Sequence, residues 1–218
     1  MKNKLASLIL SSALLLPFTS SAQEYMFTYS KLHTHMKQNG NEGHDDVKVG
    51  FFFVNAANKE LCRIEKTWME KEEHYEELKV SKYNELLVPL DANLKQANPL
   101  VFVRTPEALR CDFSMVVMSK EPLQGTVKRE TIENLLPQMH SILVELGGMF
   151  ASWFTPDVEG LTLEFPVKQP GDIVFSNGKL VTVQNGKFQF TAEELGELGT
   201  ITLPMETSRV LPYLPAAK

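Results

Sequence analysis

The two cysteines, Cys62 and Cys111, constrain the fold most, because they are the only pair in a chain of 218 residues. Neither belongs to a Cys-x-x-Cys motif, so a redox dithiol is not indicated. In an oxidising compartment an even cysteine count favours a disulfide, with metal ligation as the alternative. A bridge between them would close a loop of about 50 residues and stabilise the fold by about 4 kcal/mol.

The N-terminal segment, residues 1–22, predicts that the chain reaches such a compartment. Lys2 and Lys4 precede an apolar stretch over residues 5–18, and Ser20-Ser21-Ala22 supplies the small residues that a signal peptidase reads. This order is typical of a cleaved secretory signal peptide, with an uncleaved anchor as the alternative. We therefore expect a periplasmic protein with a disulfide. No later stretch is apolar enough to predict a transmembrane segment after cleavage.

The pattern of the remaining chain predicts an α+β fold. We expect a disulfide-stapled, β-rich, sandwich-like unit with an N-terminal helix, a central amphipathic helical segment and a C-terminal β-meander. The corresponding domain boundaries are residues 23–120, 121–158 and 159–218.

Apolar spacing indicates the elements of the first unit. Met26, Tyr29, Leu32 and Met36 recur at helical spacing and predict a helix over residues 24–38. Further strands are expected at 47–54, 86–90, 100–103 and 112–118.

Residues 61–80 are ambiguous. Residues 61–69 alternate, which favours a second strand in a hairpin with residues 47–54. Leu61, Ile64 and Trp68 also fit a helical stripe, so a helix competes.

The second half carries clearer local signals. An apolar stripe over residues 126–154 predicts a helical segment, which Pro137 should kink or split into two helices. Asn177-Gly178 and Asn185-Gly186 suit type I′ turns and predict a meander of strands at 172–175, 180–183 and 188–190. Thr191 and Glu194 form a capping box, and a final strand is expected at 200–203.

Charge and motifs exclude several classes of function. The formal net charge is -5, so the basic surplus that phosphate contacts require is missing, and no nucleic-acid partner is expected. The sequence contains no nucleophile elbow, phosphate loop, dinucleotide fingerprint or His-Glu-x-x-His motif. We therefore assign no catalytic residues, and the chain leans away from being an enzyme.

The histidines suggest an alternative function, which is metal binding. His33, His35 and His44 lie close in sequence to Asp46. Imidazole and carboxylate suit zinc or copper, so these four residues are a candidate metal site for a metal-binding protein or a metal-dependent hydrolase. A helix would point His33 and His35 to nearly opposite faces, whereas a strand would allow them to share a metal.

Aromatic residues suggest a second kind of site. Trp68, Trp153 and Phe154 are candidates for a binding platform, such as that of a carbohydrate-binding module. Aromatics at periodic positions more often belong to the core.

Three runs resemble one family: Tyr29-Ser30-Lys31-Leu32, the stretch GHDDVKVG over residues 43–50, and Cys111-Asp112-Phe113-Ser114-Met115. They are similar to an uncharacterised family of exported proteins from Gram-negative bacteria, known as a domain of unknown function. The resemblance implies an envelope location and no activity. The sequence thus predicts a non-enzymatic binding or interaction module whose partner is an envelope protein or a cell-wall component.

Overall fold

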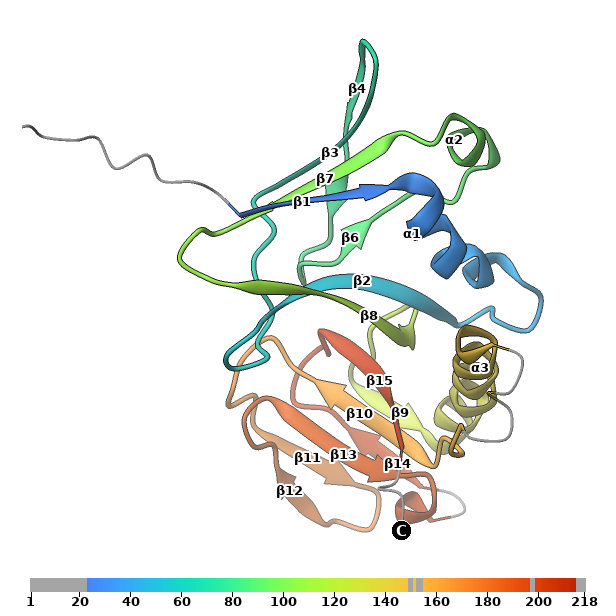
Figure 1. Cartoon of the computed structure of the whole chain (residues 1–218). Helices are drawn as coiled ribbons and strands as arrows, with labels where there is room; N and C mark the ends of the chain where they lie inside the picture. Colours follow the sequence, from blue (N-terminus) through green and yellow to red (C-terminus); the bar gives the residue numbers. More distant parts are fainter. Residues whose placement is uncertain (1–22, 149–150, 152–154, 197–198, 215–218) are drawn as a thin grey trace, which may run out of the picture.

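The computed structural model describes residues 23–148, 151, 155–196 and 199–214. It shows a mixed α+β protein in which the described strands form several antiparallel sheets. In Figure 1, strands β2 and β8 cross the middle of the molecule, between an upper sheet and the strands of the C-terminal part. Helix α3 lies along one side of this arrangement.

The upper sheet has the strand order β1-β7-β3-β4. Its strands are β1 (Gln23–Thr28), β3 (Lys66–Lys71), β4 (His74–Glu77) and β7 (Leu100–Thr105). The predicted helix over 24–38 is wrong in its first part, because exposure alternates along β1 and Met26 is 61% exposed. Helix α1 (Tyr29–Met36) then buries Tyr29, Leu32 and Met36 as the stripe predicted, and the 3-10 helix η1 (Lys37–Gly40) follows.

Strands β2 (Val47–Asn55) and β8 (Cys111–Ser119) form a long two-stranded ribbon. They pair antiparallel from Val47 opposite Ser119 to Asn55 opposite Cys111. At that end, the predicted disulfide between Cys62 and Cys111 is present, with the two Cα atoms 6.3 Å apart. The prediction of a disulfide-bridged, β-rich unit is therefore confirmed.

Residues 61–80 are extended and contain no helix. The predicted partner of this segment was wrong, however, because β3 pairs with β7 and β4, while β2 pairs with β8. Only the isolated bridge between Val54 and Leu61 remains of the expected hairpin among the described residues. Short strands β5 (Lys79–Val80) and β6 (Leu86–Leu87) pair with each other, and helix α2 (Ala92–Ala97) follows.

Helix α3 (Arg129–Gly147) follows strand β9 (Thr126–Lys128) and runs through Pro137 as one helix. An internal proline loses one helical hydrogen bond and clashes with the preceding turn, which destabilises a helix by about 3 kcal/mol. Burial offsets that cost, since the helix packs on β2, β8 and β10. The helix buries Ile132, Leu135 and Met139 of the predicted stripe, and Ile142 in addition. Three further stripe residues are only partly buried: Leu136, Leu143 and Leu146.

The C-terminal strands form two sheets, with the orders β13-β10-β15 and β12-β11-β14-β9. Their bounds are β10 (Gly160–Glu164), β11 (Asp172–Phe175), β12 (Leu180–Thr182), β13 (Lys187–Thr191), β14 (Thr200–Thr202) and β15 (Arg209–Tyr213).

The first Asn-Gly turn joins β11 to β12 as predicted, but only Gly178 of the two residues has a positive φ, so the expected type I′ turn is wrong here. At the second turn, Asn185 and Gly186 both have positive φ. The chain nevertheless leaves the hairpin there, because β13 pairs with β10 instead of β12. The predicted meander is therefore divided between two sheets. Thr191 and Glu194 do exchange the two hydrogen bonds of a capping box, beside the 3-10 helix η3 (Glu193–Leu195).

One hydrophobic cluster runs through all these sheets, from Tyr29 in α1 to Val210 in β15. It includes residues from each of the three predicted segments, such as Phe53, Ile132 and Leu163. No helix in the part of the chain that the structure describes is long and apolar enough to cross a membrane.

Candidate functional site

A cavity of about 410 Å³ lies beside strand β2, between the end of α1 and the β5–β6 hairpin. Its volume falls in the range of small-molecule sites. We call it the β2-edge cavity. Its lining combines apolar side chains with five charged ones. The lining residues are Met36, Asn39, Lys48, Val49, Phe51, Glu76, Glu77, Leu78, Lys79, Glu85, Leu86, Leu87, Val88 and Pro89.

An ion pair between Lys48 and Glu85 forms one wall of this cavity. The Lys48 ammonium lies 2.8 Å from a Glu85 carboxylate oxygen, and Glu85 is 8% exposed. The position of Glu85 is fixed locally, because Ser81 Oγ accepts hydrogen bonds from the backbone N–H groups of Tyr83 and Glu85. Gly50 leaves room for the pair, since a Cβ there would lie 3.3 Å from Glu85 Oε1.

A second cavity of about 230 Å³ lies on the other side of the same ion pair. It shares Lys48, Glu85 and Leu87 with the β2-edge cavity and adds Arg209 and Lys82. The two cavities differ in the charges that line them: three glutamates and two lysines line the β2-edge cavity, whereas three lysines, one arginine and one glutamate line the second.

Lys82 belongs to an ion pair of its own, at 2.6 Å from Glu206. The hydrogen bond with Glu206 raises the pKa of Lys82, and the same contact lowers the pKa of the Glu206 carboxyl. Both groups therefore stay charged over a wider pH range than in isolation.

The outer edge of β2 faces the β2-edge cavity, and its backbone groups are paired by different means along its length. The side-chain amide of Asn39 accepts from the N–H of Val49 at 2.7 Å and donates to the C=O of Val49 at 3.1 Å. Further along, the N–H of Cys62 donates to the C=O of Phe53 at 2.8 Å. Phe51 lies between these two positions and lines the cavity.

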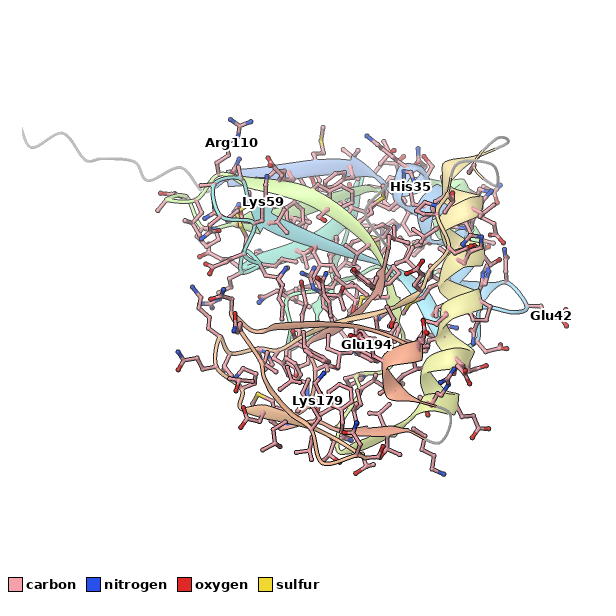
Figure 2. All side chains as sticks on the ribbon, turned by 90° about the horizontal axis from the view of Figure 1, so that it is seen from below. His35, Glu42, Lys59, Arg110, Lys179 and Glu194 are labelled. Carbon is pink, nitrogen blue, oxygen red and sulfur yellow. A yellow bond between two sulfur atoms is a disulfide. The ribbon has the colours of Figure 1, made fainter. Side chains whose placement is uncertain are left out.

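The four residues of the predicted metal site are not brought together. Over residues 23–148, 151, 155–196 and 199–214, no group of three or more His, Cys, Asp or Glu side chains could hold a metal ion. His33 and His35 both lie in α1, so they point to nearly opposite faces of a helix. Figure 2 shows His35 at the surface, and Glu42 at the tip of a loop beyond α3.

His44 and Asp46 instead attach the loop before β2 to helix α3. His44 is 2% exposed, and its ring nitrogens lie 3.0 Å from the C=O of Gln38 and 3.1 Å from Ser141 Oγ. Asp46 accepts hydrogen bonds from the amides of Asn134 and Gln138. His33, in α1, has a buried Nδ1 with no partner in the described part of the chain, and burial lowers the pKa of this histidine.

Trp68 lies in β3, where its ring stacks on Phe102 with centroids 5.1 Å apart. Lys66 and Arg104 lie over the ring at 5.2 and 5.4 Å, and its Nε1 donates to Glu70. The side chain is 8% exposed, so the structure gives it a packing role. The other two predicted aromatics, Trp153 and Phe154, lie outside the described residues.

The β3–β4 hairpin projects from the molecule in Figure 1 and carries the acidic residues that flank His74. These glutamates are exposed, as expected for a solvated surface. A cavity of about 360 Å³ lies between this hairpin and α2, lined by Met69, Glu70, Lys71, His74, Tyr75, Glu76, Leu94, Ala97 and Pro99.

Sequence reasoning missed the Lys48–Glu85 pair. The two residues are 37 positions apart, and they meet because the β5–β6 hairpin folds back against β2. One local signal was available: Lys48 is the one charged residue in the apolar run VKVGFFFV, residues 47–54. Successive side chains of a strand point to opposite faces, so a charged residue between buried ones indicates that its side chain lies on the opposite face of the ribbon.

Comparisons with known proteins show one match. A family model described as a protein of unknown function, DUF2987, matches residues 21–165, which is more than half of the chain. No curated protein and no solved structure matches this chain. The matched range includes β2, the β5–β6 hairpin and every residue that lines the β2-edge cavity.

Proposed function

Because the chain belongs to DUF2987, a family whose function is unknown, we propose a function from the structure: an exported, non-enzymatic binding module of the cell envelope that holds its ligand in the β2-edge cavity. The family model confirms the prediction from the sequence that the chain belongs to an uncharacterised family. The cavity with its Lys48–Glu85 wall is the observation that carries this proposal.

Two features support export. Residues 1–22 have the three parts of a signal peptide in the expected order. The Cys62–Cys111 disulfide is typical of proteins that fold in an oxidising compartment. Intact mass measurement on protein from the periplasmic fraction should give a chain that begins at Gln23. A full-length chain recovered from the cytoplasm would contradict export.

The arrangement of polar groups supports binding. Lys48 and Glu85 neutralise each other at 2.8 Å, so the cavity wall carries a fixed dipole without a large net charge. Apolar walls with a few positioned polar groups are the usual composition of a ligand site.

A thermal-shift screen tests the binding function. The protein would be mixed separately with blocked tripeptides, N-acetylated amino sugars and glycerophosphate. A ligand at 100 times its Kd stabilises the folded state by about 2.7 kcal/mol, which is a shift of several degrees for a chain of this size. Absence of any shift with all three panels would overturn the binding function.

A pair of variants tests the location. Leu87 is 38% exposed and lines the cavity, so Leu87→Trp should fill it without disturbing the core. Leu180 is 62% exposed on β12, a strand of another sheet, and Leu180→Trp is the matched control. We expect Leu87→Trp to abolish the shift and Leu180→Trp to retain it. Equal shifts in both variants would place the ligand elsewhere.

A further inference from the structure

The edge of β2 has one position where no strand continues the ladder. Strand β2 pairs only with β8 among the described strands, so its other edge is a free sheet edge. The partners of Val49 and Phe53 show that the odd-numbered residues turn their backbone N–H and C=O groups toward this edge. In an antiparallel strand this orientation alternates from residue to residue. Phe51 therefore points its own N–H and C=O to the same side.

The groups on either side of Phe51 are satisfied. Asn39 pairs with both backbone groups of Val49, and Cys62 and Glu60 pair with Phe53 and Asn55. Strand β6 packs close to β2 but pairs with β5 in a sheet of its own. Phe51 is thus left outside any strand ladder, at a point where it lines a cavity of about 410 Å³.

A backbone donor and acceptor that face a cavity select a ligand with an acceptor and a donor at matching spacing. The Asn39 side chain already shows this edge binding an amide, two residues away. A peptide residue in extended conformation offers the same two groups and binds sheet edges in this way. We propose that the β2-edge cavity binds a short extended peptide, one residue of which pairs with Phe51.

The walls define which peptide fits. In an added strand, the side chain opposite Phe51 points to the same face as the Phe51 side chain, which is buried in the core. Apolar residues such as Met36, Leu86 and Val88 line the cavity, so this central residue should be apolar. The flanking residues face the opposite side of the ribbon, toward Lys48 and Glu85. We take the peptide to be about three residues long, which is roughly 10 Å at a strand rise of roughly 3.3 Å per residue.

The peptide inference rests on the proposed binding function. N-methylated ligands test the pairing with Phe51 separately from binding in the cavity. The reference ligand is N-acetyl-Ala-Leu-Ala-amide. Its affinity is measured by isothermal titration calorimetry with the whole mature protein. Methylation of the Leu nitrogen removes the donor that pairs with Phe51. Methylation of the third residue's nitrogen removes a donor that points away, so it is the matched control. We expect the first to weaken binding at least tenfold and the second to change it less than threefold.

Hydrogen exchange gives a second readout. On binding the reference peptide, the Phe51 amide should become protected, while the Gly50 amide, which faces β8, should keep its rate. Equal effects of the two methylations, or an unprotected Phe51 amide, would overturn edge pairing. A sugar or phosphate that shifts the wild type but not Leu87→Trp, with no response to the peptide, would overturn the peptide inference and leave the binding function standing.

Discussion

Two groups of ion-paired side chains flank the β2–β8 ribbon, and they differ in how they are enclosed. Glu164 on β10 lies directly opposite Lys187 on β13 and Arg209 on β15, so the strand register places the carboxylate between two cations. Arg209 also covers the ring of Phe52, at 4.8 Å from its centroid. We call these three residues the Glu164 cluster. Its carboxylate and guanidinium are 6% and 7% exposed.

The Lys48–Glu85 pair has the same chemistry in an open setting. It joins a strand to a loop across two cavities, and Lys48 keeps 20% of its side-chain surface exposed. Glu164 is held by two partners, with Lys187 at one oxygen and Arg209 at the other, whereas Glu85 is held by Lys48 alone. Lys48 and Glu85 line both cavities, while Arg209 lines only the smaller one of the two. The comparison teaches that position relative to the sheet, and not residue type, determines how enclosed these charges are.

Removal of the disulfide should have the largest effect and sets the scale for both regions. The bridge holds the end of the β2–β8 ribbon and closes a loop with a sequence separation of 49. The double variant Cys62→Ser, Cys111→Ser should lower the free energy of unfolding by about 4 kcal/mol. Urea unfolding of the variant against the oxidised wild type measures this. A loss below about 1 kcal/mol would mean that packing alone fixes this end of the ribbon.

The second prediction breaks the comparison directly. Arg209→Met removes the guanidinium and leaves Glu164 buried with Lys187 alone, which should cost about 3 kcal/mol. Lys48→Met at the open pair should cost about 1 kcal/mol, because water can enter the cavities and solvate Glu85. Chemical unfolding of both variants gives the two values. Equal losses would show that the two pairs are equally enclosed.

The third prediction concerns the space that Gly50 leaves for the open pair. A Cβ at this position would lie 2.8 Å from Met118 Sδ and 3.0 Å from the Phe52 ring. Gly50→Ala should therefore destabilise the fold by about 1–2 kcal/mol through overpacking. The variant Met118→Val removes the sulfur, and the double variant should recover part of the loss. Additive losses in this double-mutant cycle would place the strain elsewhere.

The sequence predicted the features that depend on local signals or on compartment. The disulfide followed from two cysteines in a chain with an export signal, and helix α3 followed from an apolar stripe that continues past Pro137. Asn177-Gly178 marked the β11–β12 hairpin, although only Gly178 adopts a positive φ there.

Strand partners could not be predicted, because pairing depends on contacts between distant segments. Residues 61–69 and 47–54 were predicted to be two strands of one hairpin, yet β3 pairs with β7 and β2 pairs with β8, each across a long stretch of sequence. The second Asn-Gly turn is present, yet the strands on its two sides, β12 and β13, belong to different sheets. The β2-edge cavity was beyond reach for the same reason, since its walls come from residues 36–51 and 76–89.

The smallest expected effect is a pH dependence from His33, on the helix that supplies Met36 to the cavity. Burial, with Lys95 and Lys37 nearby, lowers the pKa of His33 below its ordinary value of 6.5. The unfolded chain therefore binds this proton at a higher pH than the folded chain does. The free energy of unfolding should fall as pH drops below 6.5, until the folded protein is also protonated. His33→Gln should remove this part of the slope between about pH 7 and 5, whereas His35→Gln, on another face of α1, should retain it. Urea unfolding at several pH values measures this slope. If His33→Gln kept the wild-type slope, the pH dependence would not come from His33, and acidic residues would be its source.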